Sequence, residues 1–302
     1  MPKSEKKEIL SIGGQAVIEG VMMRTKDKVA VAVRTPKGGI ATRDIPLKYG
    51  PIKKKLVKIP FFRGIIFLAE TMTVGFKAIQ FSASASTGEK EETGSSEMTI
   101  AMTVALLFGV GLFIAAPFFL TKLIHPGDGV IFNLIDGFFR IAIFVGYLLF
   151  ISMFKDIRTL FQYHGGEHMT VAAFEAGEKL DPKHIRKYSR LHPRCGTNFL
   201  LIVLIVSILV FSVATPPPLK LAVDPTILKI LDGIFKVLIR IALFPVIAGI
   251  AYEALKFGGR HHKNPIVSVF VYPGLLLQEI TTKKPTDKQI EVAIAALKQA
   301  LK

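Results

Sequence analysis

Two histidines and a glutamate lie within five residues of one another, and their spacing can serve a metal ion. His164, Glu167 and His168 follow the pattern H-x-x-E-H, which matches the inverted zinc-protease motif. Positions i and i+4 share one face of a helix, so both imidazoles can reach one metal ion while the carboxylate activates its bound water. The pattern predicts a site for a divalent metal ion, with zinc as the candidate ion and Glu167 as the catalytic general base.

The two glycines inside the motif leave a second interpretation open. Gly165 and Gly166 each disfavour a helix by about 1 kcal/mol relative to alanine, so this stretch could form a turn instead. Hydrogen-bonded loop histidines near lipid headgroups would show the same pattern without a metal ion.

Further ligands for the ion are expected from the flanks of the later apolar runs. His192 and Cys195 precede one run, and imidazole nitrogen and thiolate sulfur are both good zinc ligands. Cys195 is equally compatible with a small buried apolar residue. His261 follows the last run, and we expect it to approach His168 if the two halves of the protein pack side by side.

Four apolar runs, each near the roughly 20 residues that cross a bilayer, dominate the second part of the chain. They cover 99–120, 130–154, 198–214 and 228–255. Since charges are concentrated between them, the predicted fold class is an α-helical membrane protein with four transmembrane helices. These form one hairpin over 99–154 and another over 198–257.

The two hairpins resemble a duplication. The segment LIDGFFR at 134–140 is similar to ILDGIFK at 230–236, and each copy is followed by a Gly-Gly-x-His sequence. Because each copy holds an even number of spans, we expect parallel repeats.

Basic residues set the expected orientation. The segment 155–197, predicted as a loop with the His and Cys candidates, is rich in Lys and Arg, whereas the connectors within the hairpins are not. The positive-inside rule places this loop, the unit 1–58 and the C-terminal segment 258–302 in the cytoplasm of a bacterial cell. The prediction is a multi-pass protein of the cytoplasmic membrane with both termini inside.

The net charge of +16 is interpreted in the same way. No nucleic-acid recognition motif accompanies it, so we expect the bilayer and its anionic headgroups as partners, and no nucleic acid. A homo-oligomer is left open.

The N-terminal unit, residues 1–58, is predicted to be rich in β-structure. The run 29–33 is strand-like, 36–39 is a turn, and a return strand starts at Ile40. A glycine-rich stretch at 12–24 lacks the residues of a phosphate-binding loop, and Glu19 and Arg24 are its candidate functional residues.

Residues 60–83 are predicted to form an amphipathic helix in the membrane interface. Arg63, Glu70 and Lys77 recur every seven residues along one stripe, which makes a spanning helix costly and leaves it as the alternative. A linker is expected over 84–98.

Charged residues also occur inside the predicted spans. Asp136 with Arg140, and Asp232 with Lys236, are spaced i, i+4, which favours structural ion pairs, with ion or proton passage as the alternative. Glu253 and Asp156, near the inner ends of two spans, are further candidates for the cytoplasmic site.

Three stretches together resemble a known family. Residues 13–24, 163–168 and 192–196 are similar to the YqhQ-like family of bacterial membrane proteins, and the resemblance covers nearly the whole chain. It implies a predicted metal-dependent enzyme and no particular substrate.

Three functions therefore stand at this point. The first is a metal-dependent membrane hydrolase, and the second is a non-catalytic scaffold or assembly factor. The third is a small transporter that uses Asp136, Asp232 and Arg240.

Overall fold

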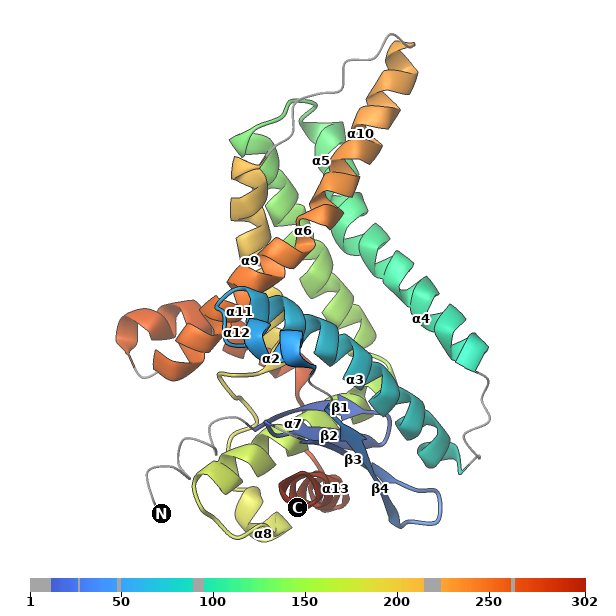
Figure 1. The fold of residues 1–302 in the computed structure, drawn as a ribbon, viewed down its shortest axis with the longest axis vertical. Coiled ribbons are helices and arrows are strands. Elements are labelled where there is room, and N and C mark those ends of the chain that lie inside the picture. Colours follow the sequence, from blue (N-terminus) through green and yellow to red (C-terminus); the bar gives the residue numbers. More distant parts are fainter. Residues whose placement is uncertain (1–11, 27, 48–49, 89–94, 215–223, 262–263) are drawn as a thin grey trace.

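The protein has three levels along its long axis, as Figure 1 shows. The computed structural model describes residues 12–26, 28–47, 50–88, 95–214, 224–261 and 264–302. A bundle of apolar helices stands above, helices α3, α11 and α12 lie across its base, and a sheet with α7 and α13 forms a cap below. The bundle consists of α4 (Ser95–Val110), the π-helical turn η1 (Gly111–Ala115), α5 (Ala116–Ile124), α6 (Val130–Ile151), α9 (Gly196–Val213) and α10 (Pro225–Ala242).

The cap contains the β-rich unit that the sequence predicts. Its four strands are antiparallel in the order β1-β2-β3-β4. They are β1 (Gly13–Val17), β2 (Gly20–Arg24), β3 (Lys28–Arg34) and β4 (Ile40–Pro46). Side chains alternate between the two faces of a strand, and both faces are buried here. Val21 and Ala30 face α13 (Asp287–Leu301), whereas Val29 and Val31 pack with Val74 of α3.

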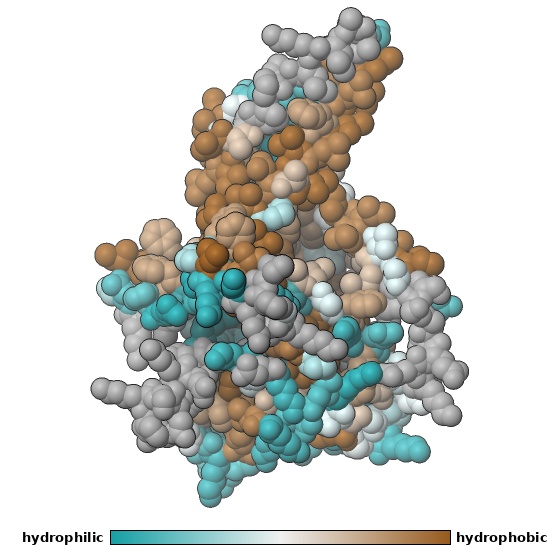
Figure 2. All heavy atoms as spheres, in the orientation of Figure 1, coloured by the Kyte–Doolittle hydropathy of each residue, from teal (hydrophilic) through white to brown (hydrophobic). Residues whose placement is uncertain are grey.

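Five helices among the described residues are long and apolar enough to cross a membrane. Figure 2 shows hydrophobic side chains covering the upper bundle, while hydrophilic side chains gather on the lower part. The chain is therefore compatible with a multi-pass membrane protein. The predicted count of four spans is not confirmed, because α3 (Phe62–Thr87) also meets the length and hydropathy of a span.

The contacts of α3 favour a place in the interface. Its second half packs on the sheet, and Glu70 is buried in ion pairs with Arg24 and Lys53 of α2 (Pro51–Leu56). Near its start, Arg63 pairs with Glu253 of α11. Charged groups along a helix are costly in hydrocarbon, so these ion pairs favour a place at the membrane surface. The interfacial interpretation remains a prediction.

The predicted fourth span is interrupted. α10 ends at Ala242, and α11 (Phe244–His261) begins after Leu243. Pro245 cannot donate a backbone hydrogen bond and its ring crowds the preceding turn, which explains the break. α11 then contacts α3, α9 and α12 (Pro265–Thr281) instead of continuing along the bundle.

Two predicted connectors are largely helical. The segment 155–197 is not a loop, since it forms α7 (Lys155–Glu175) and α8 (Pro182–Ile185). The predicted linker 84–98 includes the end of α3 and the start of α4, and its residues 89–94 lie outside the described part.

The predicted repeat is not confirmed. Gly165 and Gly166 lie in the cap helix α7, whereas their proposed counterparts, Gly258 and Gly259, lie in α11 at the base of the bundle. The two glycine pairs therefore occupy helices in different surroundings.

Candidate metal centre

The H-x-x-E-H motif lies on a helix despite its two glycines. A Cβ at Gly165 would come within 2.1 Å of the backbone carbonyl oxygen of Lys283, and the N–H of Lys283 donates to the carbonyl of Phe161 at 2.8 Å. Glycine therefore allows the segment after α12 to lie directly on α7. The glycines lower the helix propensity of this segment but permit the close contact. The alternative prediction, that Gly165 and Gly166 form a turn, did not consider such a contact.

Backbone carbonyls fix the tautomers of both motif histidines. Nδ1 of His164 lies 2.8 Å from the carbonyl oxygen of Thr281, and Nδ1 of His168 lies 2.5 Å from that of Arg190. Because a carbonyl oxygen can only accept, each Nδ1 carries a proton, and in the neutral form of each ring Nε2 holds a lone pair. Burial lowers the pKa of His168, which favours its neutral form. Metal-binding histidines are usually oriented by such carbonyl contacts.

Both motif histidines lie close to the thiol of Cys195. Sγ of Cys195 lies 3.2 Å from Nε2 of His164, and the ligand atoms of Cys195 and His168 lie within 4.8 Å of each other. Cys195 is the N-cap of α9, where the N–H of Thr197 donates to Sγ at 3.4 Å. The N-terminal end of a helix favours negative charge, so this position suits a thiolate.

These three side chains form the inner cluster: His164, His168 and Cys195. Their ligand atoms all lie within 4.8 Å of one another. Two nitrogens and a sulfur around a tetrahedral zinc ion would be separated by about 3.3–3.6 Å, so shifts of about 1 Å would complete the site. A single S–H can satisfy one imidazole lone pair only, whereas one cation would satisfy all three ligands.

Glu167 is buried on the side of α7 that faces the sheet. The N–H of Gly14 in β1 donates to its carboxylate, and a Cβ at Gly14 would come within 2.9 Å of that group. Burial raises the pKa of Glu167 to about 7, although the charge of His164 and the Gly14 N–H act in the opposite direction. Its Oε2 is buried and has no partner among the described residues, so it remains available to a further group.

His192 lies next to the inner cluster but turns its ring elsewhere. Its ring centroid is 5.7 Å from that of His168, and its Nε2 lies 3.7 Å from a carboxylate oxygen of Glu175. The side chain of Gln278 holds its backbone by accepting from the N–H at 2.8 Å and donating to the carbonyl at 2.9 Å. His192 is thus placed as a neighbour of the cluster, with its ring nitrogens engaged.

His261, expected to approach His168, does not join the inner cluster. Its ring is exposed at the end of α11, and its Nδ1 contacts the carbonyl of Phe257 at 3.0 Å in the same helix. Among the described residues only His164, His168 and Cys195 group their ligand atoms, so His261 does not converge with His168. Asp156 is likewise exposed, in the first turn of α7.

The remaining candidates connect elements of the cap and base. Glu19 accepts a hydrogen bond from the hydroxyl of Tyr163 at 3.1 Å, next to the motif on α7. Arg24 pairs with Glu70 and stacks on Phe67, 5.3 Å from its ring centroid. Glu253 also accepts from the backbone N–H of Phe61 at 3.2 Å. Of these candidates, only Glu19 contacts a residue next to the motif, and none joins the inner cluster.

Three groups that orient the histidines of the inner cluster and its neighbour His192 were missed in the sequence. They are the carbonyls of Thr281 and Arg190 and the side chain of Gln278, which is fully buried. The adjacent glycines of α7 signal that a backbone packs against this helix. Nothing in their spacing identifies the partner as a segment more than 110 residues away.

Comparison with known proteins establishes the family. A family model described as "Protein of unknown function (DUF1385)" matches residues 59–302. The chain belongs to this family. It is also 34% identical over 310 residues to the "Uncharacterized protein YqhQ" of Bacillus subtilis (strain 168), covering 96% of this chain and 92% of that protein. The resemblance to the YqhQ-like family is confirmed, and no solved structure matches.

Proposed function

We propose that this protein is a metal-dependent enzyme of the bacterial cytoplasmic membrane, with a hydrolytic reaction as the best-supported class. His164, His168 and Cys195 bind the ion. The observation that carries the proposal is the convergence of two proton-free imidazole nitrogens on one cysteine sulfur. Such a set of soft ligands suits zinc.

The number of ligands favours catalysis over a purely structural ion. Three protein ligands leave a fourth position for water or substrate, as in catalytic zinc sites, whereas structural sites use four. A bound zinc ion supplies a water of lowered pKa and polarises a carbonyl or phosphoryl oxygen. Within the chain, Glu167 is the candidate base, since it is buried beside His164 and its Oε2 has no partner among the described residues.

The location of the inner cluster in the cap favours a substrate that arrives from the cytoplasm. Cys195 caps α9 at the end that joins the cap, and the cap is assigned to the cytoplasm because its segments carry most of the Lys and Arg. Both termini then lie in the cytoplasm. The basic residues face anionic lipid headgroups, which are the expected partners at this surface.

Metal analysis of the purified protein tests the proposal. We expect about one zinc ion per wild-type chain, less than about 0.2 in His164→Ala, and full zinc content in Glu167→Gln, whose side chain is not a ligand. Exposed His261→Ala on α11 is the matched control. Substoichiometric metal in the wild type that does not change in His164→Ala would refute the metal site.

A scaffold function is favoured by a separate observation. The three ligands come from α7 of the cap and from the start of α9 in the bundle, so a bound ion would also fasten these two parts together. Complementation of a deletion strain separates the two functions. Glu167→Gln that keeps zinc but fails to complement supports catalysis, whereas full complementation by this variant supports the scaffold.

A further inference from the structure

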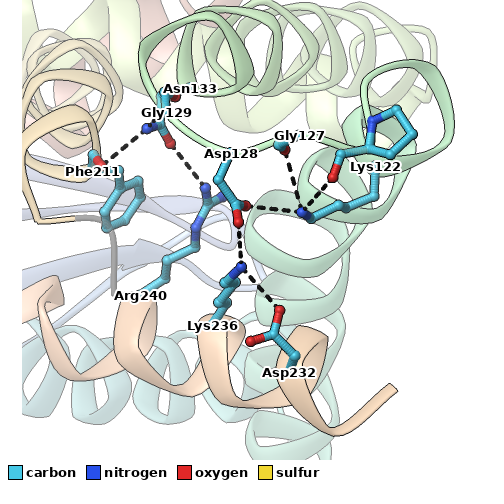
Figure 3. Close-up of polar contacts among 10 residues, drawn as sticks. Lys122, Gly127, Asp128, Gly129, Asn133, Phe211, Asp232, Lys236 and Arg240 are labelled. Carbon is cyan, nitrogen blue, oxygen red and sulfur yellow. Dashed lines mark hydrogen bonds and ion pairs between the residues drawn. The ribbon is translucent and has the colours of Figure 1, made fainter. Parts of the chain in front are cut away.

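A second group of charges lies at the opposite end of the bundle, and we call it the outer network. Figure 3 shows its contacts. Lys236 of α10 donates to Asp128 at 2.7 Å and to Asp232 at 2.9 Å. Lys122 donates to the other oxygen of Asp128 at 2.9 Å. The network thus connects α10 with the short connection between α5 and α6.

Two arginines continue the outer network towards the middle of the bundle. Arg240 donates to Asp136 at 2.8 Å and to the side-chain oxygen of Asn133 at 3.2 Å, and Arg140 donates to the other oxygen of Asp136 at 3.0 Å. Both guanidinium groups lie about 5 Å from the ring of Phe211 (5.1 and 4.8 Å). One carboxylate therefore serves two buried arginines.

The outer network carries one more positive than negative charge. Its members are Lys122, Arg140, Lys236 and Arg240 against Asp128, Asp136 and Asp232. Arg140 lies ten residues after the start of α6, roughly 15 Å along the helix and half-way through a hydrocarbon core of about 30 Å. Its Nε is buried without a partner in the described part of the chain. An uncompensated charge at this depth is costly.

A small cavity adjoins the excess charge. Its volume is about 20 Å³, enough for a particle the size of one water molecule. Lys236, Arg240 and Asn133 line it with the rings of Phe118, Phe132 and Phe211. Arg240 lies over all three rings, 4.8 Å from the centroid of Phe118, 5.7 Å from that of Phe132 and 4.8 Å from that of Phe211, so the charged walls of the cavity, Arg240 and Lys236, are the ones that favour an anion.

We propose that this cavity binds one monovalent anion of halide size, with chloride as the physiological candidate, between Lys236 and Arg240. A single negative charge neutralises the network, which explains why one carboxylate suffices for two arginines. A cavity of this size favours a small anion over a phosphate group, whether free or in a lipid headgroup. Asp128 also lines the cavity and disfavours a second anion.

Thermal unfolding of the detergent-purified protein tests the site. At constant ionic strength and constant cation, replacing gluconate by chloride or bromide is expected to raise Tm by roughly 5 °C in a saturable way. Sulfate and phosphate are expected to have no such effect. A rise that is equal for all anions, or no rise for halides, would overturn the proposal.

Two charge variants of α10, one inside the outer network and one outside it, are expected to differ in their response to halide. Arg240→Gln leaves three cations and three carboxylates, so it is expected to fold in gluconate and to lose the halide-dependent rise. Lys229→Gln, an exposed position on the same helix, is expected to retain it. Retention of the full rise in Arg240→Gln would contradict the site.

Anomalous diffraction from wild-type crystals grown in bromide tests the position without any variant. We expect one peak within about 4 Å of the Arg240 guanidinium and the Lys236 ammonium. A cavity that holds no bromide at saturating concentration would overturn the proposal, even if the variants fail to fold.

Discussion

The inner cluster and the outer network lie at opposite ends of α9 and satisfy their polar groups in different ways. Cys195 caps one end of the helix and Phe211 lies sixteen residues further, about 24 Å away. In the outer network cations face carboxylates, so nearly every charge has a partner within the protein. In the inner cluster two imidazole lone pairs face a sulfur, and no protein cation lies among the three ligands.

This difference indicates what each region requires. A network of opposite charges is held together mainly by its own members, and removal of the shared carboxylate of Asp136 leaves two guanidinium groups buried without compensation. A cluster of lone pairs is completed only by a cation from outside the chain. The outer network should therefore determine the stability of the bundle, whereas the inner cluster should determine metal binding with a smaller effect on the metal-free fold.

The largest effect is expected at Asp136. Asp136→Asn leaves two buried guanidinium groups without their shared carboxylate, so the free energy of unfolding should fall by about 3–5 kcal/mol. Thermal or denaturant unfolding in detergent measures it. A loss below about 1 kcal/mol would show that the arginines find water or lipid partners, and the contrast between the two regions would disappear.

The next effect concerns the glycines of the motif, which offer a matched pair. Gly165→Ala places a Cβ on the carbonyl of Lys283 and should lower the free energy of unfolding by about 2 kcal/mol. Gly166→Ala meets its nearest neighbour, Cβ of Pro285, at 3.5 Å, an ordinary contact, and should be neutral or stabilise by about 0.5–1 kcal/mol through helix propensity.

Equal destabilisation by both substitutions would contradict this account of the glycine pair. Equal tolerance would show that the segment after α12 can move away from α7. In that case the carbonyl of Thr281 would not fix the tautomer of His164.

Part of the candidate site and of the fold could be predicted from the sequence. The i, i+4 spacing of His164 and His168 predicts a shared helix face, and the structure places both on α7. Cys195 was predictable as a candidate by residue type and by its place before an apolar run. The spans were visible because bilayer thickness sets their length, and the strands were visible from their alternation.

What could not be predicted depends on contacts between distant segments. His192 and His261 have the same ligand chemistry as His164, but Glu175 engages the ring of His192, and the ring of His261 is exposed at the end of α11. The predicted repeat is not confirmed, because similar charged and apolar residues in two apolar helices do not by themselves indicate equivalent packing. Similar surroundings in the membrane are sufficient to produce that similarity without equivalent packing.

A smaller effect is expected at the neighbour of the inner cluster. His192→Ala removes a ring beside His168 and its contact with Glu175, so zinc affinity should fall by about tenfold, typical of a supporting residue, with the zinc content at saturation unchanged. Competition with a chromogenic chelator measures this change. Complete loss of zinc at saturation would instead make His192 a ligand.

The smallest effect is expected at His261. Because its ring is exposed and contacts only its own helix among the described residues, His261→Ala should change the free energy of unfolding by less than about 0.5 kcal/mol and leave zinc affinity unchanged. A tenfold loss of zinc affinity in this variant would show that His261 acts at the inner cluster. The arrangement of cap and base described above would then be wrong.

X-ray absorption at the zinc edge tests the central claim most directly, because it identifies the atoms bound to the ion. For zinc-loaded wild-type protein we predict one sulfur at about 2.3 Å and at least two nitrogens at about 2.0–2.1 Å, with the sulfur lost in Cys195→Ser. A shell of nitrogen and oxygen alone in the wild type would show that zinc binds elsewhere and would contradict the inner cluster as the metal centre.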